Sequence, residues 1–463
     1  MTAKNTKPAI TLAFAILVFV VLAAAILSQP GKWLSDFDQS FYLTIAYDLD
    51  RHGVFSNGAF DATDSSHSAP PPGMFFGPGY PWVVLAAMKI DARFAEVVAC
   101  IVERREGCEV YALPVLLLHA LFLTLGVLAI AHSAQLLFDS RRVFWLSGAL
   151  AAVSLLPSRD LFSFVMTESL TFCLYSVAAL GLVLAWKTAR TRDFALAGCA
   201  LGLLCLTRPS FLALLPVVAA LSVLHGYRFA APEKKRPWTQ AAVLVLGFAL
   251  VVGPWLVRNA VSVGKFGLSE EYGAATLIER FAFDGMTWRE YVLAFPHCLP
   301  GVGPPIVASL FGSDAMDRFQ YDKPGSFFAT GRARRIALVE KHGRLDPIIG
   351  EVFREELRNN GWRYVLVSLP LAWCGLWTAG IWSLALVPLF GWACLRALRQ
   401  SKPLFLLYAV PPLVMVGLHG AVANHYTRYN LILIGPFAAG AAWIICWWIS
   451  RARSPSRARA PAP

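Results

Sequence analysis

The feature that most constrains this 463-residue chain is a series of apolar segments, most of them long enough to cross a bilayer. A membrane-spanning helix needs about 20 apolar residues to traverse the hydrocarbon core. Hydrophobic residues make up 57% of the chain and charged residues only 15%, against roughly 25% charged residues in ordinary soluble proteins. A disordered chain, a coiled coil and a simple soluble enzyme are therefore excluded. About ten spans are predicted, at 9–28, 111–138, 143–157, 167–186, 194–207, 210–226, 239–257, 375–395, 403–421 and 429–449.

Basic residues mark every second connection between these segments, so that all of the basic clusters fall on one face of a ten-helix bundle. The net charge of +12 is concentrated in these connections, and the cytosolic loops of membrane proteins collect Lys and Arg. We therefore expect both termini in the cytosol and the two long polar segments, 30–110 and 259–362, outside it. The clusters are Lys4 and Lys7; Arg141 and Arg142; Lys187, Arg190 and Arg192; Arg228, Lys234, Lys235 and Arg236; Arg396, Arg399 and Lys402; and Arg451, Arg453, Arg457 and Arg459.

These boundaries predict an all-α polytopic membrane protein in four parts. Residues 1–258 form an N-terminal transmembrane core that includes the outer loop 30–110, and residues 259–362 form a small extracytoplasmic domain. Residues 363–450 add the last membrane helices, and residues 451–463 are a basic cytosolic tail. The first span is expected to be a retained signal anchor, because its apolar run exceeds the 7–15 residues usual in a cleaved signal peptide. The apolar stretch 363–374 is a candidate for a separate interfacial helix.

Cysteines Cys100 and Cys108 both fall in the first outer segment. An oxidising compartment would allow them to form a disulfide, and two free thiols are the alternative. The other cysteines considered lie in or beside spans and are expected to be core residues. These are Cys173, Cys199, Cys205, Cys374, Cys394 and Cys446.

The first outer segment opens with a predicted amphipathic helix, because Phe41, Ile45 and Leu49 recur at helical spacing. Asp36 and Asp38 lie at its start. Aspartate is a preferred helix cap, and the positive end of the helix dipole favours it. Capping accounts for one of the two carboxylates and leaves the other for chemistry.

Ionisable residues from five separate segments fall at the same outer membrane edge in this topology. A single charged residue at the end of a span is often explained by a side chain reaching out to water. A group containing both signs favours a functional site instead. The five residues are Asp38, Glu168, Arg208, Arg258 and Arg428.

An ordered set of short motifs resembles the GT-C superfamily of membrane glycosyltransferases, and more narrowly its bacterial branch related to protein O-mannosyltransferases and aminoarabinose transferases. The first-loop pattern begins at Asp38 and Tyr42, although Gln39 stands where the aminoarabinose transferases carry Glu. The remaining motifs follow in the family's order along most of the chain. They are Pro78-Gly79-Tyr80-Pro81, Met166-Thr167-Glu168-Ser169-Leu170, Leu206-Thr207-Arg208-Pro209, Pro254-Trp255-Leu256-Val257-Arg258-Asn259 and His425-Tyr426-Thr427-Arg428-Tyr429.

This resemblance implies transfer of a hexosyl or pentosyl group from a polyprenyl-phosphate carrier to an acceptor hydroxyl at the outer face of a bacterial plasma membrane. Asp38 would be the general base, with Asp36 and Glu168 as further catalytic carboxylates. Inversion is favoured, because two residues spaced like Asp36 and Asp38 at a helix start do not face one another. Arg258, then Arg208 and Arg428, would hold the lipid phosphate together with Tyr42. Tyr80, His425 and Tyr429 would support the site or contact the acceptor, which would be a lipid, a glycan or a protein.

No cofactor is expected, since the sugar-bearing lipid is a substrate, and no cluster with metal-ligand spacing or nucleic-acid motif is present. Two other functions remain open. A ten-helix transporter or flippase of envelope lipids or glycans would place ionisable residues or broken helices near the middle of the membrane. A non-catalytic scaffold for envelope assembly would not need Asp38 together with several arginines at one edge.

Overall fold

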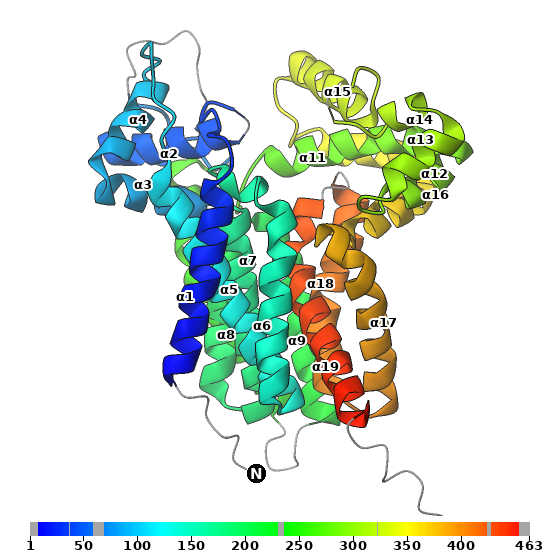
Figure 1. Ribbon diagram of the computed structural model, residues 1–463. Coiled ribbons are helices and arrows are strands. Elements are labelled where there is room, and N and C mark those ends of the chain that lie inside the picture. The colour runs from blue at the N-terminus through cyan, green and yellow to red at the C-terminus, as the bar shows by residue number, and fades with distance from the viewer. Residues whose placement is uncertain are drawn as a thin grey trace, which may run out of the picture.

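The computed structural model describes residues 8–36, 38–58, 69–229, 236–321, 323–423 and 427–452. Its regular elements within these ranges are all helices, and the predicted all-α fold is confirmed. The long helices run side by side as a bundle (Figure 1). They are α1 (Pro8–Leu27), α5 (Leu113–Phe138), α6 (Arg141–Leu155), α7 (Glu168–Thr188), α8 (Thr191–Thr207), α9 (Leu214–Arg228), α10 (Pro237–Ser262), α17 (Ser383–Arg399), α18 (Pro403–Val422) and α19 (Ile434–Ala452).

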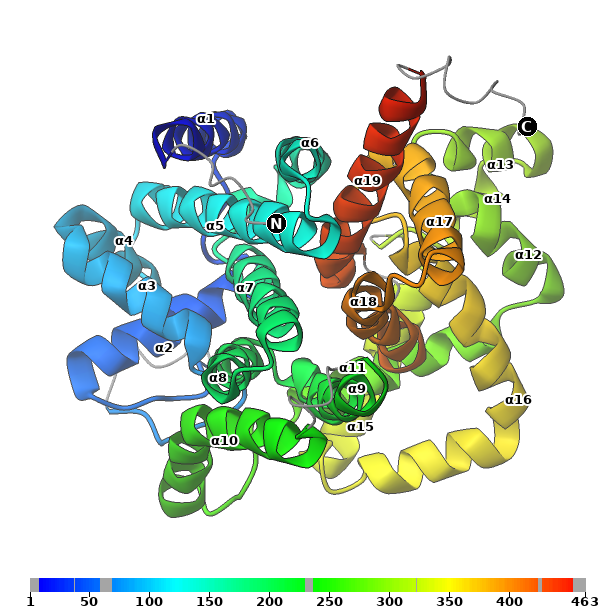
Figure 2. The same cartoon turned by 90° about the horizontal axis from the view of Figure 1, so that it is seen from below.

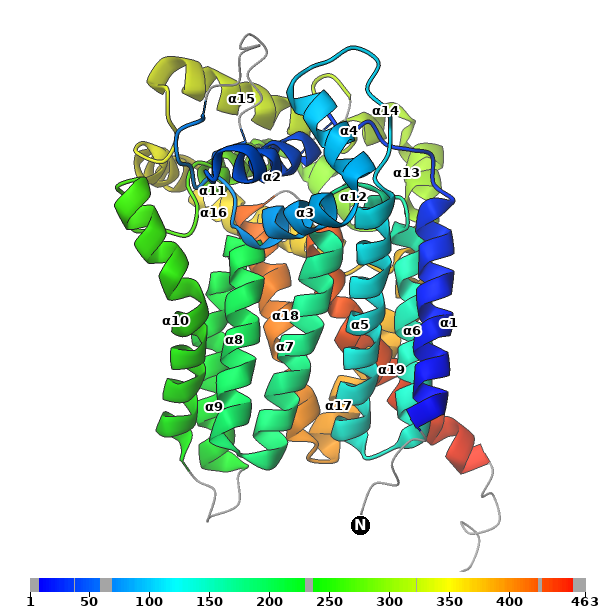
Figure 3. The same cartoon turned by 90° about the vertical axis from the view of Figure 1, so that its left-hand side faces the viewer.

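Each of the ten predicted spans corresponds to one helix of this bundle. Among the described residues, eight helical segments are long and apolar enough to cross a membrane. The remaining two, α6 and α8, have 15 and 17 residues. They come from the short predicted segments 143–157 and 194–207, and they run alongside α5 and α7 (Figure 3). The chain is thus a polytopic membrane protein.

The shorter helices gather at one end of the bundle in two groups (Figure 1). One group comes from the first long polar segment and the other from the second. The basic connections α5–α6, α7–α8 and α17–α18 lie at the opposite end (Figure 3), as the alternation of the loops predicts. The groups are α2 (Gln39–His52), α3 (Gly79–Ile90) and α4 (Ala92–Val102), and α11 (Tyr272–Phe281), α12 (Trp288–His297), α13 (Gly303–Phe311), α14 (Asp314–Asp317) and α15 (Phe327–His342).

Helix α16 (Ile349–Gly375) joins the second outer group to the last three spans. The separate helix expected at 363–374 is instead the second half of α16, which continues across a kink where Asn360 leaves helical geometry. Viewed from below, α16 passes along the edge of the bundle (Figure 2). Its exposed Trp362, Val365 and Leu369 give this half the apolar surface that made it look interfacial.

Short 3-10 turns connect several of these helices, and three of them extend membrane spans at the outer end. The turn η3 (Pro209–Ala213) precedes α9, and η7 (Thr427–Leu433) precedes α19. Three more turns lie outside these spans at η1 (Leu156–Ser158), η2 (Leu161–Ser163) and η5 (Ala282–Gly285), and η6 (Gly380–Trp382) leads into α17.

Two disulfides fasten the outer segments. The predicted alternative of a Cys100–Cys108 bridge is confirmed, with Cα atoms 5.7 Å apart. Cys374 was expected to be a simple core cysteine, and this is wrong, because it forms a disulfide with Cys298. The two residues are separated by 76 positions in the sequence. Their pairing arises because α12 folds back against α16, which no local pattern reveals.

Candidate active site

A cavity of about 400 Å³ lies where the first outer group, the second outer group and the membrane bundle meet. Its walls come from α2, the start of α7, the end of α8, α11, the end of α18 and η7. They also include the loop that leads into α3. The polar and aromatic residues of the lining include Asp38, Tyr42, Phe75, Thr167, Glu168, Thr207, Arg208, Ser269, Tyr272, His419 and Tyr429.

Asp38 occupies the position that caps α2, but its side chain makes no capping hydrogen bond. The carboxylate instead lines the cavity, where its Oδ2 lies 3.9 Å from Nη2 of Arg428 and its side chain is 32% exposed. Burial within the surrounding protein raises the pKa of Asp38 despite the opposing charge of Arg428, and the nearby Glu168 carboxylate raises it further. Capping therefore does not explain Asp38. Asp36 is exposed and does not line the cavity.

Glu168 begins α7 and stands between two arginines. Its Oε1 lies 3.7 Å from Nη1 of Arg208 and 3.8 Å from Nε of Arg428. The positive end of the α7 dipole also favours a carboxylate at this place. The side chain is only 4% exposed, yet its second oxygen, Oε2, has no hydrogen-bond partner among the described residues. A buried carboxylate oxygen without a partner is costly, so it marks a place where a ligand donor would be bound favourably.

The ring of Tyr429 contacts the guanidinium groups of both Arg208 and Arg428. The guanidinium carbons of Arg208 and Arg428 lie 4.5 Å and 5.1 Å from the centre of its ring, within the range of a cation–π contact. Nη2 of Arg428 also donates a hydrogen bond of 3.3 Å to the Tyr429 hydroxyl. The phenol thus fixes the position of two cations without adding negative charge, and of the two Arg208 lines the cavity.

Tyr42 and Tyr80 form an aromatic layer behind Asp38. Their rings meet edge to face at 5.0 Å, and only Tyr42 reaches the cavity. Burial raises the pKa of both phenols well above the ordinary value. His119 donates its Nδ1 proton to the carbonyl of Phe162, so its Nε2 accepts the hydrogen bond from the Tyr80 hydroxyl at 2.7 Å. Tyr80 therefore positions Tyr42 rather than contacting a ligand.

Arg258, the first-ranked phosphate ligand from the sequence, does not line the cavity. Its guanidinium donates to the carbonyls of Gly73 at 2.5 Å and Phe55 at 2.7 Å, and to Oδ1 of Asn259 at 3.0 Å. Its guanidinium carbon also lies 5.0 Å from the centre of the Trp255 ring. In this geometry Arg258 fastens the first outer loop to the end of α10.

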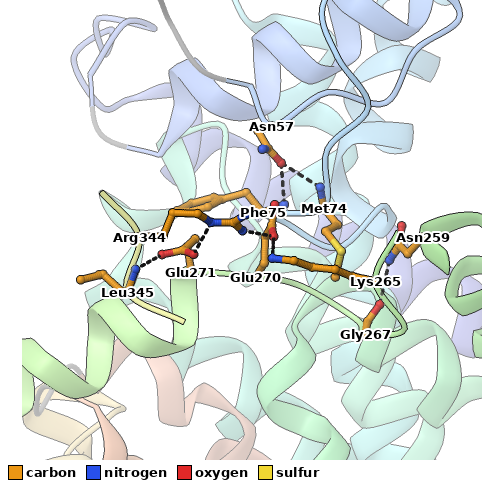
Figure 4. A network of polar contacts seen from close by, with 10 residues as sticks. All are labelled: Asn57, Met74, Phe75, Asn259, Lys265, Gly267, Glu270, Glu271, Arg344 and Leu345. Atoms are coloured by element: carbon orange, nitrogen blue, oxygen red, sulfur yellow. Dashed lines mark hydrogen bonds and ion pairs between the residues drawn. The ribbon is translucent and has the colours of Figure 1, made fainter. Parts of the chain in front are cut away.

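The rim of the cavity is held by a polar network (Figure 4). Oδ1 of Asn57 accepts hydrogen bonds from the backbone N–H groups of Met74 and Phe75, at 2.7 Å and 3.0 Å. Oε2 of Glu270 pairs with Lys265 and Arg344, each at 2.5 Å. Although burial opposes ionisation, these two cations hold the pKa of Glu270 below its usual value. The network joins the first outer loop to the α10–α11 and α15–α16 connections, and so fixes Phe75, Ser269 and Tyr272 around the cavity.

The motifs recognised in the sequence touch one another here. A Cβ on Gly79 would lie 2.4 Å from Oγ1 of Thr207, and one on Gly77 would lie 2.1 Å from the carbonyl oxygen of Leu206. Only glycine allows this approach of the loop to the end of α8. Gln39 accepts a hydrogen bond of 2.8 Å from the N–H of Val165, just before the motif that contains Glu168. Gln39 thus connects the start of α2 to the segment that contains Glu168.

Sequence reasoning missed several residues of the cavity, above all His419 and Tyr272. His419 lies inside a predicted span, and a polar residue in such a segment is itself a signal of function. Tyr272 carries no such signal, because it reaches the cavity only through the fold of the α10–α11 connection. The neighbouring Tyr429 and burial raise the pKa of Tyr272 well above its usual value.

Of the remaining predicted residues, His425 lies outside the described residues. Within the ranges that the structure describes, His, Cys, Asp and Glu side chains do not come together in threes in a way that could hold a metal ion. That neither metal nor cofactor takes part stays a prediction.

Comparison with known proteins gives little to set beside this geometry. The chain matches no protein-family model and no curated protein. Among solved structures it is similar to the crystal structure of ArnT from Cupriavidus metallidurans bound to undecaprenyl phosphate. That similarity has a TM-score of 0.37 and 16% identity, and it covers 93% of this chain and 77% of that one.

Proposed function

We propose that this protein is a glycosyltransferase that moves a sugar from a polyprenyl-phosphate carrier to an acceptor hydroxyl at the outer face of the membrane. The observation that carries the proposal is that motifs from distant parts of the chain line one cavity. They bring a carboxylate of raised pKa into contact with an arginine. These are the groups that such a transfer needs, a base for the acceptor and cations for the departing phosphate.

Asp38 is the general base of the proposed reaction. As the acceptor oxygen attacks the anomeric carbon, its proton passes to the Asp38 carboxylate. The bond between the anomeric carbon and the phosphate oxygen breaks, and its electron pair leaves with the lipid phosphate. A single displacement of this kind inverts the anomeric centre. A pKa above the ordinary aspartate value makes Asp38 a stronger base.

Arg208 and Arg428 are the proposed phosphate ligands. They share the charges of Glu168 and Asp38 at 3.7–3.9 Å, longer than the 2.7–2.9 Å of a close charge-assisted hydrogen bond. The phosphate gains a negative charge as it leaves, and both guanidiniums can stabilise that charge where it develops. Arg258 serves instead as a positioning residue for the first outer loop.

A direct test is to reconstitute the purified protein in nanodiscs and offer a panel of radiolabelled polyprenyl-phosphate hexoses and pentoses. The acceptor is supplied as an extract of envelope lipids and glycans. We expect turnover of one donor, with release of polyprenyl phosphate and the opposite anomeric configuration in the product. Absence of both turnover and donor binding would contradict the proposal. Movement of an intact lipid or glycan across the bilayer without bond cleavage would establish the transporter instead.

A further inference from the structure

His419 brings to the cavity a polar group that the proposed reaction does not yet use. It lies in the last turn of α18 and is 6% exposed. Its ring forms part of the cavity wall and lies 5.5 Å from the ring of Tyr429. The side chain is thus next to the residue that supports both phosphate-binding arginines.

Asn430 sets the tautomer of His419. The distance between Nδ1 of His419 and Oδ1 of Asn430 is 2.8 Å. An amide oxygen only accepts hydrogen bonds, so Nδ1 carries the proton. The amide itself is confined, because a Cβ on Gly375 would lie 2.5 Å from its Nδ2. Close packing therefore holds the acceptor of this hydrogen bond, the Asn430 amide, in one orientation.

This arrangement leaves Nε2 of His419 as a bare acceptor. Nε2 has no hydrogen-bond partner among the described residues. It is also not one of their fully buried, unpartnered side-chain atoms. The uncharged Asn430 offers nothing to stabilise a second proton on the ring. His419 therefore presents a neutral acceptor to the cavity.

Glu168 lines the same cavity and adds a second acceptor. Its Oε2 is buried and has no hydrogen-bond partner among the described residues, while Oε1 of the same carboxylate faces both arginines. Two unfilled acceptors match a ligand that brings two hydrogen-bond donors. The hydroxyl groups of a sugar ring are such donors, whereas a sugar carboxylate would meet the negative charge of Glu168.

We propose that Nε2 of His419 and Oε2 of Glu168 accept hydrogen bonds from two hydroxyls of the transferred sugar, so that the donor carries a neutral sugar with free hydroxyls. This inference rests on the proposed function and specifies its substrate class. His419 is a specificity-determining residue, and Asn430 positions it.

The test compares two substitutions of His419, each of which keeps a polar group at the position of a different ring nitrogen. The amide of His419→Gln reaches the place of Nε2, whereas the shorter amide of His419→Asn reaches only that of Nδ1. Each is assayed in nanodiscs with the accepted polyprenyl-phosphate sugar, its monodeoxy analogues and the matching uronic acid. His342→Asn, at an exposed position on α15, is the control for the substitution itself.

We expect the wild-type protein to use the parent sugar about tenfold better, in kcat/KM, than at least one deoxy analogue, because one hydrogen bond is lost. The uronic acid should be used more poorly still. His419→Asn should abolish the discrimination against that one analogue, and His419→Gln should recover most of it. His342→Asn should behave as the wild type.

Each contrary result points to a different failure. If the wild type turns over a donor, but His419→Asn keeps the full discrimination against every deoxy analogue, the role of His419 is wrong and the transferase stands. Preferred use of the uronic acid would likewise overturn the substrate class alone. If the wild type neither binds nor consumes any donor, the proposed function fails and this inference fails with it. Melting curves for each variant separate loss of folding from loss of recognition.

Discussion

The side chain of Asp38 does not cap the helix that it precedes. It stands where a helix cap is expected, but its carboxylate faces the cavity instead of the helix N–H groups. The sequence could place two aspartates at this helix start but could not say which of them was the cap. The structure separates them, since Asp36 is exposed and Asp38 approaches Arg428.

The raised pKa of Asp38 predicts a pH dependence of activity and of stability. The base must be ionised, so kcat/KM should fall as pH drops through a value above the ordinary ~3.9 of aspartate. The folded protein binds this proton more tightly than the unfolded chain. The stability that the proton provides is present at low pH and lost as pH rises through the folded pKa. At neutral pH the permanently neutral Asp38→Asn should therefore melt at the same or a higher temperature. A clearly lower melting temperature would contradict burial as the dominant cause of the shift.

Arg258 is predicted to act through the loop that it holds. Arg258→Met removes the hydrogen bonds to Gly73 and Phe55 and leaves those carbonyls short of partners, at a cost of about 1–3 kcal/mol. We expect a lower melting temperature in detergent, with donor affinity changed less than in Arg208→Met or Arg428→Met. Arg358→Met, at an exposed position on α16, is the matched control. Equal loss of donor affinity in Arg258→Met, Arg208→Met and Arg428→Met, without loss of stability in Arg258→Met, would show that Arg258 binds the phosphate.

At the scale of elements, the sequence predicted what depends on local pattern. The ten apolar segments and the basic connections at one end follow from hydropathy and charge, and each segment became a helix. The continuity of α16 across Asn360 was missed, because the run before Asn360 is polar and the run after it is apolar. Cys298–Cys374 and the approach of Tyr272 to the cavity were missed because they depend on how distant segments pack.

Contact between the loop before α3 and the end of α8 can be tested through its glycines. Gly79→Ala would push a methyl group to 2.4 Å from Oγ1 of Thr207, and overpacking of this kind typically costs about 1–3 kcal/mol. We expect a lower melting temperature and reduced turnover, because Thr207 and Arg208 form part of the cavity. Gly391→Ala is the control, since a Cβ there meets nothing within 4 Å. If both variants melt as the wild type does, the close approach of these elements is not required.

At the scale of the whole molecule, the cavity exists only where three bodies meet. The first outer loop, the second outer group and the bundle each contribute walls. The N–H of Glu270 donates a hydrogen bond of 3.1 Å to the carbonyl of Met74, so the network around Glu270 also contacts the first outer loop (Figure 4). The resemblance of the motifs predicted which chain segments matter. It did not predict this network, because ion pairs between separate loops have no fixed spacing in the sequence.

Glu270→Gln should loosen the contact between the α10–α11 and α15–α16 connections. The ion pairs with Lys265 and Arg344 hold the pKa of Glu270 low, so their stabilisation is present above the ordinary glutamate pKa and is lost as pH falls through the lowered value. The variant should therefore melt below the wild type at pH 7, and the difference should shrink in acid. Exposed Glu355→Gln is the comparison. A gap that stays constant down to acid pH would show that charge is not what Glu270 contributes.

The measurement that tests the central claim most directly is donor consumption by a pair of matched variants. Asp38→Asn and Asp36→Asn make the same chemical change two residues apart, one at the cavity and one at an exposed position. With the donor that the wild type accepts, we expect Asp38→Asn to lose about 10²–10⁴-fold in kcat while it still binds that donor, and Asp36→Asn to retain wild-type turnover. Equal turnover by Asp38→Asn and the wild type would contradict the account, because Asp38 would then not be the base.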